Sequence, residues 1–288
     1  MNDVARSRRG ARVRGARIAL MLASMACACA GSPSPMLPAS EPASQLARLG
    51  WLLTAVGAVV CVVIAVLLLV PGIRGWRAGS AIDPAAVHRG GGERLIVICG
   101  IIIPIVILVG VFVVTATTLS KTSHPPTRPR FMVEVTGHQW WWEVHYPTTD
   151  PTQNVTTANE IHIPVGEPVE LRVESGDVAH SFWVPRLQGK IDLIPGQTNT
   201  FWIRADSAGT YRGQCAEDCG LQHAHMAMQV IAQPLPQFEQ WLAHQRAPAA
   251  TPTDSLALAG REAFQRQACS LCHAIAGTDA AGKLGPNL

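Results

Sequence analysis

Two long stretches of the chain are apolar without a single charged residue, and they dominate its hydropathy pattern. Residues 49–70 and 95–114 contain no Asp, Glu, Lys or Arg, and mildly polar residues extend the second stretch to Leu119. Each reaches the roughly 20 residues that a helix needs to cross a bilayer. The pattern therefore predicts transmembrane helices over 49–70 and 95–119, with Pro104 tolerated because neighbouring groups can satisfy the freed backbone.

The segment between these helices predicts their orientation. Loop 71–94 carries more basic than acidic residues: Arg74, Arg77, Arg89 and Arg94 against Asp83 and Glu93. Basic loops stay in the cytoplasm. We therefore expect a two-pass protein of the bacterial inner (cell) membrane, with everything after residue 119 on its periplasmic or outer face.

The N-terminus has the pattern of a secretory signal. Six arginines within residues 6–17 precede the apolar stretch 18–30, which is too short to span a bilayer. We predict a signal peptide over 1–30. Small residues precede Cys27 and Cys29, so either could be a lipidated mature N-terminus, and an ordinary cleaved signal is the equal alternative. Residues 31–48 are expected to be a linker.

After the helices the pattern changes to short alternating runs. Val169, Leu171 and Val173 share one face of such a run, and turn residues such as Pro195 and Gly196 separate the runs. Short strands at this spacing indicate an all-β sandwich or barrel. The fold class is therefore a two-helix hairpin followed by an all-β domain over 120–246, which includes a short helix at 236–246. A linker at 247–254 and a short helical segment from residue 255 complete the chain.

Composition narrows the class of protein. Only 15% of the residues are charged and 48% are hydrophobic, against about 25% charged in soluble proteins. The formal net charge is +3, which argues against a nucleic-acid-binding protein.

The densest chemical signal lies in residues 215–226, which read CAEDCGLQHAHM. Thiolate, imidazole and thioether form a soft ligand set that selects copper, and the order Cys, His, Met on one loop is typical of blue-copper sites. The additional Cys allows two thiolates to bridge two copper ions. Zinc is the main competitor, but a Met is not expected among its four ligands. A disulfide between Cys215 and Cys219 is the third interpretation of this motif.

A second imidazole must come from elsewhere in the chain. His180 fits, because it lies at the end of a predicted strand. His162 lies in an alternating strand and is expected to be a surface or satisfied histidine, and His225 is expected not to be a ligand.

Three further motifs make the chain recognisable. They are HSFWVPRLQGKID from His180, GQCAEDCGLQH from Gly213 and GHQWWWE from Gly137. With the two helices, they make residues 49–246 resemble subunit II of cytochrome c oxidase. The resemblance implies a cupredoxin fold that carries the binuclear copper centre CuA.

By the family pattern, Cys215 and Cys219 bridge both copper ions. One copper would take His180 and Met226, and the other His223 and the backbone carbonyl of Glu217. The Glu217 side chain would reach a magnesium ion at the interface with subunit I. The resemblance also implies that the chain is part of a respiratory oxidoreductase and proton translocase. The implied partners are the haem-bearing subunit I, subunit III, and cytochrome c as electron donor.

The resemblance gives roles to two more residues. Trp140 would be the exposed residue that receives electrons from cytochrome c, while Trp141 and Trp142 are expected to pack the strand or an interface. The family usually has Tyr where this chain has Trp141. Glu93 could be a proton-uptake carboxylate, although a charged helix end is the simpler reading.

Residues Cys269, Cys272 and His273 form a CSLCH sequence, the attachment signature of c-type haem. With the later LGPNL, it resembles the start of a cytochrome c domain fused to subunit II. A downstream Met usually supplies the sixth iron ligand, but residues 274–288 contain neither Met nor His. We therefore expect 255–288 to be an incomplete cytochrome c-like segment, with Cys269, Cys272 and His273 as its candidate haem c-binding residues.

One alternative function uses the same residues. The chain could be a membrane-anchored copper-binding electron carrier or copper-delivery protein without an oxidase partner. Such a protein would not need paired helices or three consecutive tryptophans, so the oxidase reading is favoured.

Overall fold

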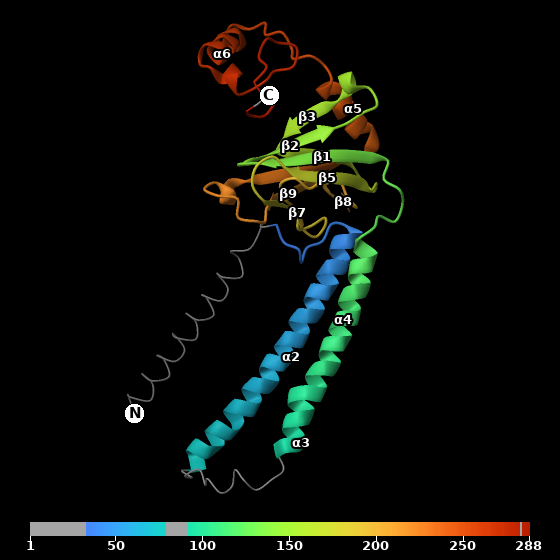
Figure 1. The fold of residues 1–288 in the computed structure, drawn as a ribbon, viewed down its shortest axis with the longest axis vertical. Coiled ribbons are helices and arrows are strands. Elements are labelled where there is room, and N and C mark those ends of the chain that lie inside the picture. The colour runs from blue at the N-terminus through green and yellow to red at the C-terminus, as the bar shows by residue number, and fades with distance from the viewer. Residues whose placement is uncertain (1–32, 79–91, 283) are drawn as a thin grey trace, which may run out of the picture. The chain divides into compact units, whose positions relative to one another are not determined.

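A computed structural model of the chain describes residues 33–78, 92–282 and 284–288 (Figure 1). These residues form a helical hairpin, a β-domain and a short helical C-terminal segment. The predicted signal peptide, with Cys27 and Cys29, lies outside the described residues, as do residues 79–91 of the predicted loop.

The first membrane helix, α2, covers Glu41–Ala78 and is longer at both ends than hydropathy predicts. Residues 41–48, which we expected within the linker, are helical. Ser40 explains the early start, because its hydroxyl accepts the backbone N–H of Ala43 at 3.1 Å, in the manner of an N-cap. Glu41 in the first turn adds a favourable charge at the positive end of the helix dipole.

The second membrane helix runs as α3 (Gly92–Val97), a π-helical turn η2 (Ile98–Ile102) and α4 (Ile103–Thr122). Pro104 accounts for the π turn. The N–H of Ile103 bonds to the carbonyl of Ile98, five residues back, and Pro104 has no N–H to donate.

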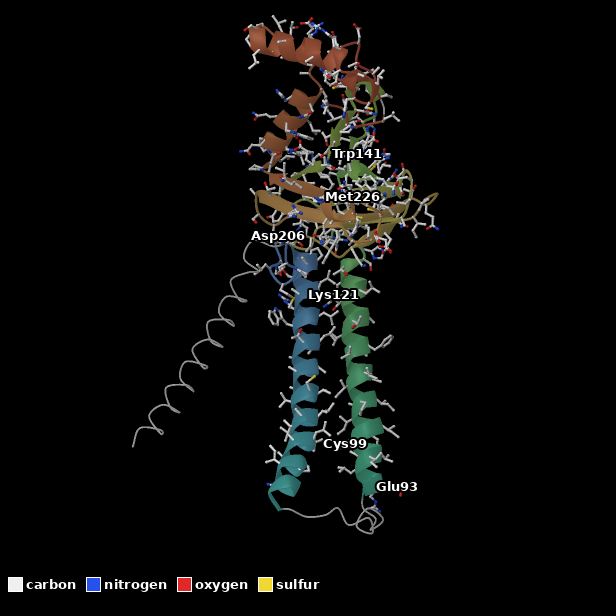
Figure 2. The ribbon with its side chains drawn as sticks, turned by 90° about the vertical axis from the view of Figure 1, so that its left-hand side faces the viewer. Glu93, Cys99, Lys121, Trp141, Asp206 and Met226 are labelled. Atoms are coloured by element: carbon white, nitrogen blue, oxygen red, sulfur yellow. The ribbon has the colours of Figure 1, made fainter. Side chains whose placement is uncertain are left out.

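Both helices expose their apolar side chains. The segments Glu41–Gly75 and Gly92–Thr122 are long and apolar enough to cross a membrane. Leu67 and Phe112 are 63% and 71% exposed, in a surface with few charges (Figure 2). A continuous apolar surface of this kind needs lipid or another protein around it. The hairpin therefore anchors the chain in a membrane.

The β-domain consists of two five-stranded sheets packed face to face, which confirms the predicted β-sandwich. The first sheet has the order β3-β2-β1-β5-β8 and the second the order β4-β10-β9-β6-β7. The strands of the first sheet are β1 Phe131–His138, β2 Trp141–Tyr146, β3 Val155–Ala158, β5 Val169–Ser175 and β8 Asn199–Ile203. Those of the second are β4 Glu160–Pro164, β6 His180–Trp183, β7 Ile191–Leu193, β9 Gly209–Cys215 and β10 Ala227–Gln233.

The core lies between the sheets and follows the alternation that the sequence shows. In β5, Val169, Leu171 and Val173 are buried, while Arg172 between them is exposed. The pairs β1–β5 and β10–β4 are parallel and the others are antiparallel, so both sheets are mixed. Phe238 of α5 (Leu235–Gln245) also enters the core.

Hydrogen bonds tie each membrane helix to the β-domain. Beside α2, the buried hydroxyl of Ser40 donates to the carbonyl of Leu187 at 2.5 Å. Beside α4, the indole N–H of Trp202 donates to the carbonyl of Thr122 at 2.9 Å. The domain is therefore fixed to both legs of the hairpin.

The C-terminal segment contains α6 (Ser255–Arg266) and the short 3₁₀ turn η5 (Cys269–Leu271). Asp254 caps α6, because its carboxylate accepts the N–H of Ala257 at 2.9 Å. Residues 255–266 of α6 bury no side chain, so this helix gains little from core packing.

Candidate metal centre

Strand pairing brings the distant histidine and the cysteine loop together. Phe182 of β6 pairs with Cys215, the last residue of β9, and the backbone N–H of Ala216 donates to the carbonyl of Ser181. At the far end of the loop, the N–H of Cys215 donates to the carbonyl of Met226 at 2.9 Å. The loop between Cys215 and Met226 is therefore closed at its base, next to His180.

Six donor atoms converge in this loop. Sγ of Cys215 lies 3.9 Å from Nδ1 of His180 and 3.2 Å from the carbonyl oxygen of Glu217. Sγ of Cys219 lies 3.6 Å from Nδ1 of His223 and 3.6 Å from Sδ of Met226. The ligand atoms of His180, Cys215 and Cys219 all lie within 4.8 Å of one another.

The donor set fits copper better than it fits a structural zinc ion or a disulfide. Both cysteines are free and buried, so the structure does not show the disulfide. Two sulfurs, two imidazole nitrogens, a thioether and a carbonyl exceed the closed four-ligand set of a structural zinc site. They match the soft ligands that copper prefers.

The two thiols differ in acidity. Burial opposes the charged form of Cys215, but the hydrogen bond with His180 and further backbone bonds outweigh it and lower the pKa of this thiol. Burial, and next the charge of Cys215, raise the pKa of the Cys219 thiol. Because a metal ion binds the thiolate and not the thiol, loading of this site depends on pH.

Glycine at position 137 makes room for His180. A Cβ atom at Gly137 would lie 2.9 Å from Cδ2 of the His180 ring, closer than side chains approach one another. Trp142 packs on the same imidazole, with ring centroids 6.0 Å apart. The His180 ring is therefore held between β1 and the core, and its exposed fraction is 0%.

The three consecutive tryptophans occupy three different environments. Trp142 is fully buried, whereas Trp141 is half-buried and stacks on His138 at 4.8 Å. Trp140 is not on a strand but in the turn between β1 and β2, and its indole N–H donates to the carbonyl of Cys219 at 3.0 Å. Trp140 is half-buried, because its ring lies over the loop that carries the thiols.

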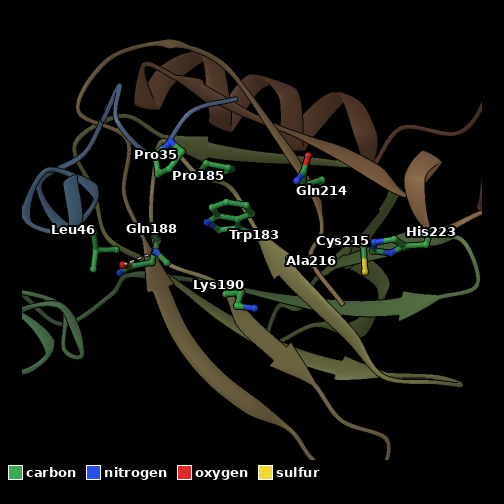
Figure 3. A pocket seen from close by; sticks show the side chains of 11 residues that line it. Pro35, Leu46, Trp183, Pro185, Gln188, Lys190, Gln214, Cys215, Ala216 and His223 are labelled. Carbon is green, nitrogen blue, oxygen red and sulfur yellow. Dashed lines mark hydrogen bonds between the residues drawn. The ribbon is translucent and has the colours of Figure 1, made fainter. Parts of the chain in front are cut away.

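A groove of about 550 Å³ leads from the start of α2 to the loop 215–226, which carries the candidate metal ligands. Its wall includes Pro35 and Leu46 at one end and Cys215 and His223 at the other, with Trp183 between them (Figure 3). Glu217 is exposed beside this loop.

The haem signature has a partly built environment of its own. Nδ1 of His273 lies 2.8 Å from the carbonyl oxygen of Pro286, and the N–H of Gly285 donates to the carbonyl of Cys272. A Cβ atom at Gly285 would lie 2.7 Å from Cε1 of the His273 ring. Residues 284–288 thus hold the histidine in one orientation, with Nδ1 occupied and Nε2 free of that bond.

Three further residues considered from the sequence are not among the six converging donors. His162 is buried and satisfied, with Nδ1 2.8 Å from Oε1 of Gln233 and its ring stacked on Trp241. His225 is exposed in the 3₁₀ turn His223–His225. Glu93 is exposed in the first turn of α3 (Figure 2).

Fold and donor set together define a class of protein. The chain is membrane-anchored, its outer domain has a cupredoxin-like fold, and the loop at one end of the sandwich is a candidate copper site. Residues 131–233 match the family described as cytochrome c oxidase subunit II, periplasmic domain. The β-domain therefore matches the model of the cytochrome c oxidase subunit II family, which confirms the resemblance that the motifs indicate.

Two relatives that are similar in sequence carry the name of this family. The chain is 38% identical to cytochrome c oxidase subunit 2 of Alkalihalophilus pseudofirmus over 69% of its own length and 57% of the relative's. It is 29% identical to cytochrome c oxidase subunit 2 of Bacillus subtilis, over 94% of its own length and 81% of the relative's. A crystal structure of the periplasmic domain of subunit II from Bradyrhizobium japonicum aligns with 28% identity and a TM-score of 0.39, covering 42% of this chain and 96% of that one.

Proposed function

We propose that the chain is the electron-accepting subunit of a haem–copper respiratory oxidase. Electrons from cytochrome c would reach the outer domain and pass to the haems of subunit I, where oxygen is reduced to water with proton translocation. The observation that carries the proposal is the convergence of six donors at the loop 215–226. Their arrangement fits a binuclear copper centre, which would supply one-electron transfer with little change of geometry.

Each of the six residues has a place in that centre. Cys215 and Cys219 would bridge the two copper ions as thiolates. His180 and Met226 would complete one copper, and His223 and the carbonyl of Glu217 the other. Burial of the sulfurs keeps water from the thiolates, and Met226, as the weak ligand, would tune the potential.

Trp140 is the residue that we propose as the point of electron input. Its indole is partly accessible and its N–H is bonded to the carbonyl of Cys219, so one hydrogen bond separates the surface from a bridging residue. A redox partner that docks transiently makes a small contact. A single accessible ring can therefore supply the route.

The partner surfaces are proposed as follows. The groove beside Cys215 and His223 would face subunit I, and the exposed Glu217 side chain would reach a magnesium ion there. Subunit III would complete the complex. The loop 71–94 would lie in the cytoplasm and the β-domain in the periplasm, and Glu93 at the cytoplasmic helix end is a candidate for proton uptake.

One experiment decides the assignment of the metal centre. The full chain, purified in detergent and loaded with copper, should bind two copper ions and show a mixed-valence EPR signal with near-infrared absorption. Binding of one tight zinc and never two coppers would overturn the proposal. An accompanying twelve-helix subunit I would exclude the solitary carrier or copper-delivery function.

We also propose that residues 255–288 can attach haem c through Cys269, Cys272 and His273. The bond from Nδ1 of His273 to the Pro286 carbonyl supports this, because such bonds fix the tautomer of a ligating histidine. Expression with a cytochrome c maturation system should give a chain that retains haem under denaturing conditions. A Cys269→Ser, Cys272→Ser double variant is the control, and a haem-free wild type would refute the attachment.

A further inference from the structure

Asp177 links two elements that meet at the metal-ligating loop. Its carboxylate Oδ1 lies 2.8 Å from Nε2 of His180, and its Oδ2 accepts the backbone N–H of Gln139 at 2.7 Å. Gln139 immediately precedes Trp140 in the turn between β1 and β2. One carboxylate therefore contacts both a candidate copper ligand and the turn that carries the proposed point of electron input.

We propose that Asp177 is a positioning residue that fixes the tautomer of the buried His180 imidazole and holds the Trp140 turn against the copper loop. The part of this inference that concerns electron transfer rests on the proposed function. The part that concerns the His180 tautomer does not depend on bound copper.

The first half of the argument concerns His180. Its Nδ1 faces Sγ of Cys215 at 3.9 Å, so the copper-ligating lone pair must lie on Nδ1 and the proton on Nε2. His180 is 0% exposed, so bulk water cannot accept that proton. Asp177 provides the acceptor. Metal-bound imidazoles are commonly oriented by a carboxylate in this way, which also makes the ligand more basic.

The Asp177 carboxylate accepts hydrogen bonds from the His180 ring and from the backbone N–H of Gln139, one on each oxygen. The carboxylate is itself fixed by its own turn, since the N–H of Asp177 bonds to the Ser175 hydroxyl and the N–H of Val178 bonds to Oδ1.

The second half concerns the turn at residues 139–140. Besides its bond to Asp177, Gln139 donates from Nε2 to the carbonyl of Cys219 at 2.8 Å. The same carbonyl accepts the indole N–H of Trp140. The N–H of Gly176 adds a bond to the carbonyl of Gly137 at 3.0 Å. The turns 175–178 and 137–140 are thus packed together, and Asp177 is the charged group between them.

The copper-loaded chain tests the effect on the ligand. In Asp177→Asn, the neutral amide makes His180 a weaker donor, so the oxidised state is less stabilised. The reduction potential should rise while the copper content stays at two per chain. Glu174→Gln is the matched control, because it removes a nearby exposed charge that does not touch His180. A turn-capping role alone would lower the melting temperature and leave the potential equal to that of Glu174→Gln, which would overturn the proposal.

The metal-free chain tests the tautomer independently of copper. The full chain carrying Cys215→Ala, which removes the thiolate that would draw the proton to Nδ1, is labelled with ¹⁵N-histidine and measured at alkaline pH where the ring is neutral. In this background His180 should be the Nε2–H tautomer. Asp177→Ala should give a mixture of tautomers, and an unchanged tautomer would overturn the proposal. If Asp177→Asn fails to load copper, this measurement still tests whether Asp177 fixes the His180 tautomer. If the wild-type chain never binds two copper ions, the proposed function is wrong. The tautomer measurement still tests the inference about Asp177 and His180 in that case.

Discussion

Trp140 donates its indole N–H to the backbone carbonyl of Cys219 at 3.0 Å. The two residues are far apart in the sequence, and the contact joins the turn between β1 and β2 to the loop between β9 and β10. It places an accessible aromatic ring directly on a proposed copper-bridging residue. The role of this contact in electron input can be tested by substitution of Trp140.

Replacing Trp140 with Gln should slow reduction of the copper centre by cytochrome c by about tenfold or more, equivalent to roughly 1.4 kcal/mol or more in the barrier. The reason is that the ring, and not only its N–H, would carry the electron. Stopped-flow reduction and copper content should be measured on the same preparation. Trp141→Gln is the matched control, since Trp141 stacks on His138 and does not contact Cys219 through its indole N–H. Normal copper with a normal rate in Trp140→Gln would reject Trp140 as the input.

Cys215→Ser and Cys219→Ser should each abolish the mixed-valence EPR signal. A serine oxygen cannot replace a thiolate bridge between two soft metal ions. Met226→Leu should keep two coppers and shift the reduction potential, because an axial thioether tunes a site more than it holds it. Loss of copper in Met226→Leu, with normal copper in either serine variant, would reverse the proposed roles.

Gly137→Ala should change the copper site directly, in addition to lowering the stability of the domain. The added Cβ would lie 2.9 Å from the His180 ring and must displace it. Overpacking of this kind costs about 1–3 kcal/mol. Gly213→Ala is the control, because its Cβ would meet Met228 and Val184 at 2.9 Å instead of a proposed ligand. We expect a similar loss of melting temperature in both variants and altered copper spectra only in Gly137→Ala. Equal spectra would show that the His180 ring can move without consequence.

The loop between the membrane helices should be cytoplasmic. A reporter enzyme that is active only in the periplasm should be inactive when fused at Gly91 and active when fused after Arg246. Cysteine labelling from outside the cell should give the same map. A periplasmic Gly91 would reverse the topology that the arginines indicate.

Sequence patterns predicted the helices and the sandwich because burial dictates both. Uninterrupted apolar residues require lipid, and alternation in residues such as Val169, Leu171 and Val173 requires a half-buried strand. The ends of the helices depended on other signals. Ser40 starts α2 through a single capping bond, and Pro104 imposes a π turn, neither of which changes the mean hydropathy.

The candidate ligands were visible in the sequence because metals restrict which side chains can bind them. Their supporting residues were not visible. Gly137 matters through the space it leaves, and Asp177 through a carboxylate that meets a turn distant in the sequence. Such contacts depend on how the strands pair, which composition does not encode. The position of Asp177 three residues before His180 was the only local signal.

The bonds from Ser40 to Leu187 and from Trp202 to Thr122 have a consequence for kinetics. A domain hinged on one leg could tilt over the bilayer, and the gap to an acceptor in the membrane would then fluctuate. Tunnelling rates fall exponentially with such a gap. Two anchoring points, one on each leg, restrict how far the sandwich can tilt on the hairpin. If the domain carries the proposed copper centre, a restricted tilt favours a single rate of onward electron transfer, so that the arrival of the donor is the variable step.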